Sequence, residues 1–140
     1  FDGNADMNIT SFDDLLRAAK AQPEPQRLLF VFTGAELPAD ASDTQREQFA
    51  AGEGGELAPL MCVDKSLSDL THFDQLKAEA ERAGPPWAIV FAGAMGGRGG
   101  QAPSSADAAA PLQRMVDSIK AGQLAGMLPF NRDGVPVNLA

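Results

Sequence analysis

The residues with the greatest capacity for chemistry gather in one glycine-rich segment, 93–105. Its sequence is Gly-Ala-Met-Gly-Gly-Arg-Gly-Gly-Gln-Ala-Pro-Ser-Ser. The segment follows an apolar run, 87–92, that is typical of a buried strand, and it precedes an expected helix. A loop between a strand and a helix can present bare backbone N–H groups to an anion. We therefore predict that the best candidate binding site of this chain lies in this loop.

Further polar groups are expected beside this loop. In an open parallel sheet, ligands bind beyond the carboxyl ends of the strands, which would bring 33–34, 64–66 and 93–105 to one rim. Arg98 would supply a fork of donors and Lys65 a point charge. The candidate anion-binding residues are Lys65, Ser66, Gly96, Gly97, Arg98, Gly99, Gly100, Ser104 and Ser105. The alternative is a surface loop that tolerates glycine because nothing packs on it.

The known nucleotide-binding motifs are not met by this segment. Residues 97–102 fit the pattern G-x-G-x-x-A, but Pro103 follows directly and the glycines lie several residues past the strand. A dinucleotide fingerprint needs a loop that opens the helix at once. A P-loop needs Gly-Lys-Ser or Gly-Lys-Thr, which the sequence does not contain.

Catalytic and metal-binding patterns are equally sparse. The chain has a single cysteine, Cys62, and a single histidine, His72, so we predict no metal site, no cofactor and no catalytic residue. This favours a protein that is not an enzyme. Cys62 lies inside an apolar run and is expected to be buried and inert. Trp87 is expected to plug one end of the core; the alternative is that it presents a surface to a partner.

The apolar pattern predicts an α/β protein with the element order α-β-α-β-α-β-α-β-β. We expect three parallel strands in a small open sheet, followed by a C-terminal antiparallel β-hairpin, with the helices packed on the sheet. The helices are expected at about 11–21, 43–51, 67–83 and 111–121, the strands at 28–32, 57–63 and 87–92, and the hairpin at 127–137.

Serine residues mark the expected helix starts. Ser11, Ser66 and Ser104 each begin a Ser-x-x-Asp pattern, and Ser42 begins a variant with glutamine, which is the signature of an N-terminal cap. Pro111 would break a helix that began at Ser104. We therefore expect a short turn at 104–109 and a helix that starts at Pro111.

The overall charge excludes some classes of partner. The net charge of −8 repels phosphate backbones and anionic membranes, so neither nucleic acid nor membrane is an expected partner. A cationic patch on another protein would fit. No apolar run reaches the length of a membrane span. The expected organisation is a flexible leader over 1–8 and one domain over 9–140, in the cytoplasm.

Several stretches of the sequence carry a family resemblance. The chain resembles a family of small β-proteobacterial proteins that are commonly labelled "ribonucleotide reductase subunit alpha". The similarity runs from Met7 to the end and is carried by 11–19, 26–32, 57–65, 84–88 and 111–116. The label implies a large barrel with several reactive cysteines, which a chain of 140 residues with one cysteine cannot form. We interpret the label as a misannotation that transfers no catalytic residue.

These observations lead to two hypotheses of function. The first is a small acidic domain that binds another protein without catalysis, or serves as an accessory protein. The alternative is a domain that binds a small anion or a nucleotide through the loop at 93–105. A catalytic role in ribonucleotide reduction is judged incompatible with the chain.

Overall fold

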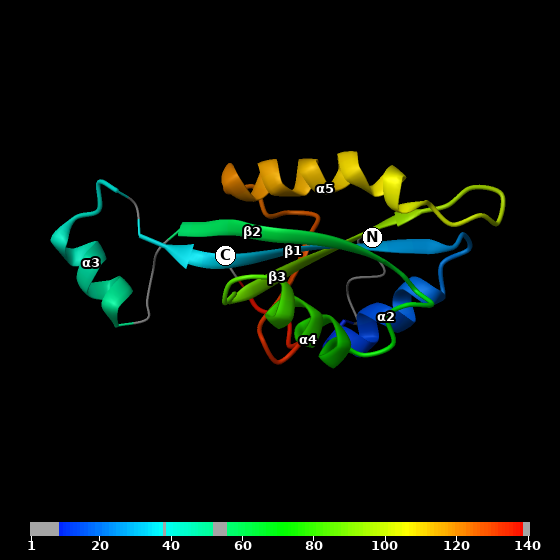
Figure 1. Ribbon diagram of the computed structural model, residues 1–140, viewed down its shortest axis with the longest axis horizontal. Helices are drawn as coiled ribbons and strands as arrows, with labels where there is room; N and C mark the ends of the chain where they lie inside the picture. Colours follow the sequence, from blue (N-terminus) through cyan, green and yellow to red (C-terminus); the bar gives the residue numbers. More distant parts are fainter. Residues whose placement is uncertain (1–8, 38, 52–55, 139–140) are drawn as a thin grey trace.

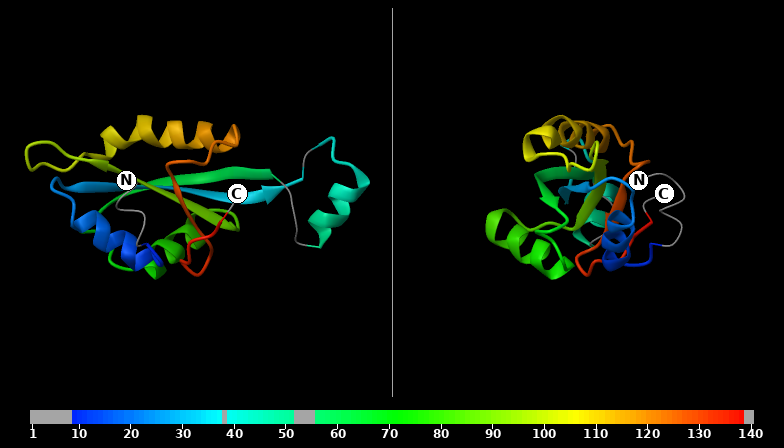
Figure 2. Two further views of the ribbon diagram at one scale, coloured as in Figure 1. Left: turned by 180° about the vertical axis from the view of Figure 1, so that it is seen from behind. Right: turned by 90° about the vertical axis from the view of Figure 1, so that its right-hand side faces the viewer.

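A four-stranded sheet lies between two layers of helices in the computed structural model, which describes residues 9–37, 39–51 and 56–138 (Figures 1 and 2). The expected leader over 1–8 lies outside these residues. The elements are α2 (Phe12–Lys20), β1 (Gln26–Glu36), α3 (Asp43–Ala50), β2 (Glu56–Ser66), α4 (Phe73–Ala83), β3 (Ile89–Gly96), α5 (Ser105–Lys120) and β4 (Leu128–Phe130).

Every neighbouring pair of strands in this sheet is antiparallel. The strand order is β2-β1-β3-β4, and β1 pairs with both β2 and β3 in the opposite direction. The prediction of three parallel strands is therefore wrong. The physical reason is that β1 is central and covered on both faces, so residues 28–33 are all buried. In such a strand, apolar and polar residues do not alternate, so its sequence resembles that of a strand in a parallel sheet.

The side chains on the two faces of β1 belong to two separate apolar clusters. Phe30 and its alternate neighbours pack against α2 and α4, while Leu29 and Val31 pack against α5. Phe12 of α2 contacts the rings of Phe30 and Phe130, at centroid distances of 5.8 and 5.4 Å. The end-on view shows α5 above the sheet and α2 and α4 below it (Figure 2). Three of the four expected helices therefore pack on the sheet, giving three layers, whereas α3 does not.

The serine caps are confirmed at three of the four expected positions. The hydroxyls of Ser11, Ser42 and Ser104 each accept a hydrogen bond from the backbone N–H three residues on. Ser66 is different, because its hydroxyl donates to the Asp69 carboxylate at 2.8 Å within a turn. The third helix consequently begins at Phe73, six residues later than predicted.

The last helix contradicts the expected break at Pro111. α5 runs without interruption from Ser105 to Lys120, with the proline inside it. A proline removes one helical hydrogen bond at a cost of about 3 kcal/mol. Four buried side chains along one stripe of α5 offset that cost, together with the capping box of Ser104 and Asp107.

The C-terminal hairpin is only partly formed. β4 pairs with β3, while the expected second strand is reduced to a bridge between Phe130 and Pro136. Gly134 in the intervening turn has a φ of 75°, as the sequence predicts. In that conformation a residue with a side chain would be strained.

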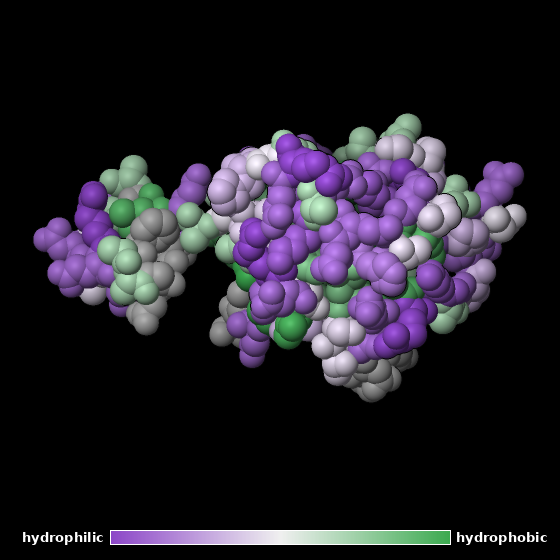
Figure 3. All heavy atoms as spheres, turned by 60° about the horizontal axis from the view of Figure 1, so that its bottom comes forward, coloured by the Kyte–Doolittle hydropathy of each residue, from purple (hydrophilic) through white to green (hydrophobic). Residues whose placement is uncertain are grey.

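One element stands apart from the layers. α3 joins β1 to β2 at the far end of their long hairpin and projects away from the body of the molecule (Figures 1 and 3). We call residues 36–56 the arm. The side chains described for the arm are exposed or half-buried, and none of them belongs to either apolar cluster. Leu57, the first residue after the arm, packs at the edge of the cluster on the α5 side.

Candidate functional site

The antiparallel sheet brings together only part of the expected rim. Arg27 of β1 pairs with Ser66 of β2 and with Met95 of β3, so the carboxyl ends of β2 and β3 lie at the same end of the sheet. β1 runs the other way. Its expected contribution, 33–34, therefore lies at the opposite end of the sheet.

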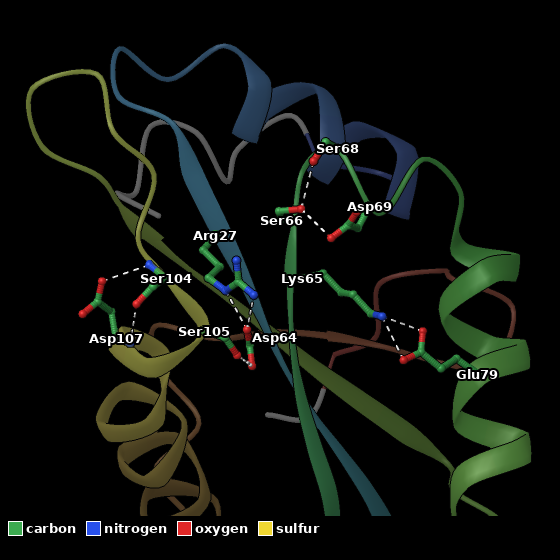
Figure 4. A network of polar contacts seen from close by, with 10 residues as sticks. All are labelled: Arg27, Asp64, Lys65, Ser66, Ser68, Asp69, Glu79, Ser104, Ser105 and Asp107. Carbon is green, nitrogen blue, oxygen red and sulfur yellow. Dashed lines mark hydrogen bonds and ion pairs between the residues drawn. The ribbon is translucent and has the colours of Figure 1, made fainter.

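Asp64 is the centre of a polar network at this end (Figure 4). Its carboxylate accepts hydrogen bonds from Arg27 Nε at 2.6 Å and from Ser105 Oγ at 3.0 Å. Burial acts to raise the pKa of Asp64, but the bonds from Ser105 and Arg27 outweigh it and hold the pKa below its usual value. The network ties β1, β2 and the start of α5 together. Ser105, a candidate ligand residue, is thus engaged in holding the fold.

Lys65 points to the other face of the sheet. Its Nζ atom lies 2.6 and 2.8 Å from the two carboxylate oxygens of Glu79 on α4, as Figure 4 shows. Ser66 bonds to Ser68 and Asp69. Lys65 and Ser66 are therefore committed to partners within the fold, away from the glycine loop.

The backbone N–H groups of the glycine loop are also largely committed. Gly97 donates to Pro25, Gly100 donates to the Glu24 carboxylate at 2.9 Å, and Arg98 and Gln101 bond to each other in both directions. The capping box of Ser104 and Asp107 occupies the start of α5. Because these donors already have partners, the loop does not offer the cradle of free N–H groups that the sequence suggests.

A hollow of about 610 Å³ nevertheless lies beside the loop, on the α5 side of the sheet. Its wall includes three of the candidate residues, Gly96, Gly97 and Arg98. It also includes Arg114, which the sequence analysis missed. Arg114 comes from the middle of α5, on the same helix face as Asp107 and Pro111. A helical projection of 105–120 would have shown that face, had the helix been expected to run through Pro111.

A different feature lies along the edge of the sheet. β2 has eleven residues and β1 as its strand neighbour, so its other side carries no strand in the described part of the chain. Cys62 near its middle is exposed, which corrects the expectation of a buried thiol. The error arose because an edge strand leaves alternate apolar positions uncovered, which its composition alone does not reveal.

A small apolar groove runs beside this edge on the α4 side. It holds about 30 Å³ and is lined by Met61 and Val63 of β2 and by Leu76, Ala80 and Ala83 of α4, among others. Met61 and Val63 are only half-buried. The edge thus offers unpaired backbone groups together with apolar side-chain contacts.

Trp87 is a plug in the core and not a surface residue. It is 3% exposed, and its ring packs edge-on against Phe32 and Phe73 at 5.0 and 6.4 Å. Arg132 covers the ring from 4.9 Å and donates to the Trp87 carbonyl. This supports the expectation that Trp87 closes one end of the core.

Comparisons with protein-family models, with curated proteins and with solved structures find no match to this chain. Among the described residues, no helix combines the length and apolar character needed to cross a membrane. The function is therefore argued from the geometry of the chain itself.

Proposed function

We propose that this chain binds an extended segment of another protein, which adds as a strand to the free edge of β2. The observation that carries the proposal is the eleven-residue edge strand with a single strand neighbour. Such an edge is a template for further pairing, which proteins usually block with charges, prolines or short length. Strand addition is a recurring mode of peptide recognition, in which backbone bonds give affinity and alternate side chains give specificity.

The side chains at the middle of β2 favour this mode. Residues 60–63 are Leu-Met-Cys-Val and carry no charge. The two charged residues that follow, Asp64 and Lys65, are neutralised by Arg27 and Glu79 within the fold. An incoming strand would meet an apolar stretch, and a methyl group of one of its side chains would fit the small groove between β2 and α4.

The arm indicates the charge of the partner. It joins the start of β2 and holds six acidic residues against one basic residue, Arg46, which accounts for five of the eight net negative charges. Opposite charge steers association and sets partner choice. We infer that the partner segment is apolar with basic residues at one end. If the added strand is antiparallel to β2, as in every pair of this sheet, those basic residues follow its apolar part.

Catalysis is not part of the proposal. The polar residues around the end of the sheet are bonded to one another, and the single cysteine lies on an edge strand without a histidine partner among the bonds of the described residues. The reductase label of the family that the chain resembles needs several cysteines, so we propose an accessory or adaptor role and no reductase activity.

Cys62 allows a direct test, because it is the only thiol in the chain and lies on the proposed edge. Short displayed peptides are selected on the protein, and the best binder is added before alkylation of Cys62 with iodoacetamide. We expect the selected peptides to be apolar with flanking lysine or arginine, and to slow the alkylation. Hydrogen exchange should show new protection at the amides of β2.

Two variants separate the edge from the rest of the surface. Cys62→Lys places a charge that blocks an edge strand, and we expect it to abolish peptide binding, whereas the matched control Cys62→Ser should retain it. Selected peptides that protect amides of α5 or of the arm, and leave β2 unchanged, would refute the proposal. Self-association through β2, detected by sedimentation at rising protein concentration, would also contradict it.

A further inference from the structure

The hollow beside the glycine loop has two arginine side chains in its wall. Arg98 comes from the loop and Arg114 from α5, and both residues are exposed. Neither guanidinium has an ion pair within the described residues, whereas the guanidiniums of Arg17, Arg27 and Arg132 each have one. Two guanidiniums that share a concave wall, with their donors free, are suited to bind a carboxylate or phosphate oxygen.

The glycines explain why the hollow exists. The end of β3 and the loop that follows, 93–97, carry only one large side chain, Met95, so α5 lies above a floor with little to fill the gap. At Gly97 a side chain would collide with the Gln101 carbonyl, at 1.8 Å from the added carbon. The glycine run thus serves to make space, while the N–H groups of Gly97 and Gly100 are bonded to Pro25 and Glu24 in the segment before β1.

A second hollow, which includes several apolar side chains in its wall, adjoins the first along α5. A second space of about 220 Å³ shares Pro111 and Arg114 with the first and is lined further on by Gly93, Met115 and Met127. Arg114 stands at the junction of the two. A ligand that placed its charge near Arg114 could therefore extend an apolar part over the floor of β3.

Asp107 limits how much negative charge a ligand in this hollow can carry. It lines the same hollow, and bonds from the backbone and hydroxyl of Ser104 lower its pKa, so it stays ionised. Two guanidiniums and one carboxylate leave a single positive charge in the wall. That balance favours a monoanion and disfavours the multiple charges of a nucleotide.

From these observations we infer that the hollow binds a small organic monocarboxylate with an apolar chain, held by Arg98 and Arg114 at its carboxylate. This site is separate from the edge of β2 and does not depend on the proposed binding of a protein.

Calorimetric titration with octanoate, acetate and inorganic phosphate tests the inference on the intact chain. Octanoate should bind at least about tenfold more tightly than acetate, because its apolar chain is buried in addition to the charge. Phosphate should bind more weakly than octanoate. Phosphate binding as tight as that of octanoate, or the absence of octanoate binding at millimolar concentration, would overturn the inference.

Single substitutions locate the site. Arg114→Ala and Arg98→Ala should each weaken octanoate binding about tenfold, since each removes charge-assisted hydrogen bonds to the carboxylate. Arg82→Ala is the matched control, because Arg82 is an exposed arginine on α4, at the opposite face of the sheet. None of the three should change the melting temperature of the free protein. Equal weakening by Arg82→Ala would refute the site.

Gly93→Ala tests the apolar extension separately. A Cβ atom there would lie 3.4 Å from Sδ and Cε of Met115, an ordinary contact that the fold can accept. The added methyl group narrows the second space, so octanoate should bind several-fold more weakly while acetate is unaffected. An unchanged affinity for octanoate would exclude the extension over β3.

Discussion

The two edges of the sheet are built in opposite ways. β4 has three residues, one of them Pro129, and the tail folds back over it with bonds from Asn131 N–H to Val135 and from Val137 N–H to Pro129. β2 has eleven residues, and no such cover lies on its outer side in the described part of the chain. Each edge strand contains a proline, Pro129 in β4 and Pro59 near the start of β2. In the described residues, one edge is short and covered by the tail, whereas the other is long and uncovered.

The comparison places the buried contacts on one edge, and the proposed strand addition would place recognition on the other. Phe130 on the closed edge is fully buried and packs against Phe12 of α2. The middle of the open edge is half-buried or exposed, and its charged residues are already neutralised. Substitutions on the closed edge should therefore affect folding, and those on the open edge should affect binding.

The largest effect is expected at Phe130. Phe130→Ala would leave a cavity among aromatic rings at the closed edge and should lower the free energy of unfolding by about 3–5 kcal/mol. Urea denaturation followed by circular dichroism measures the change. Val135→Ala is the control, because Val135 lies in the same tail but is 49% exposed, and it should have almost no effect. Similar losses for the two variants would show that the tail does not close the edge.

Gly134 tests the turn that closes β4. Its φ is 75°, and an added Cβ would lie 3.0 Å from the Phe73 ring. Gly134→Ala should therefore cost about 1–3 kcal/mol, from backbone strain and from the crowded ring. Gly126→Ala has a comparable φ of 87° with nothing within 4 Å, so it isolates the strain. If thermal unfolding gives the two variants equal losses, the contact with Phe73 contributes nothing.

Asp64 tests how the open edge is anchored on its inner side. Its pKa is lowered in the folded state, so the stability it provides is present above the unfolded value near 3.8 and is lost as the pH falls below it. Asp64→Asn should lower the free energy of unfolding by about 1–2 kcal/mol at neutral pH. It should also flatten the loss of stability between about pH 5 and about pH 3, the range in which an aspartate carboxyl group normally titrates. Parallel pH profiles for the variant and the parent would show that the network does not anchor β2.

The smallest effect on stability is expected at Cys62. Cys62→Lys changes an exposed side chain on the open edge and should alter the free energy of unfolding by no more than about 0.5 kcal/mol. The same variant should lose peptide binding, as described above. A large destabilisation with binding retained would reverse the assignment of the two edges.

Local structure was predictable from the sequence, whereas strand direction was not. The helix at Phe12 follows from apolar spacing and a serine cap, and the helix at Asp43 from its serine cap, because these signals act within one or two turns. The run at 28–32 correctly indicates burial on both faces. It cannot indicate direction, since a central antiparallel strand under two helical layers has the same composition as a parallel one.

The candidate site was predictable in its position but not in its chemistry. The segment at 93–105 does line a hollow, of about 610 Å³. The prediction that Lys65 lies beside the glycine loop is wrong, because strand alternation turns its side chain toward Glu79, on the other face of the sheet. Arg114 was missed because Pro111 was expected to start the helix, and a residue three positions later was then not aligned with Asp107.

The arm has a practical consequence for handling this protein. Its described side chains make no contribution to the two apolar clusters, and both of its ends enter one antiparallel pair through Glu36 and Glu56. A fluorescent label or a second folded module inserted beside α3 would therefore lie beyond the end of this antiparallel pair. Such a reporter would leave the two apolar clusters and the hollow untouched.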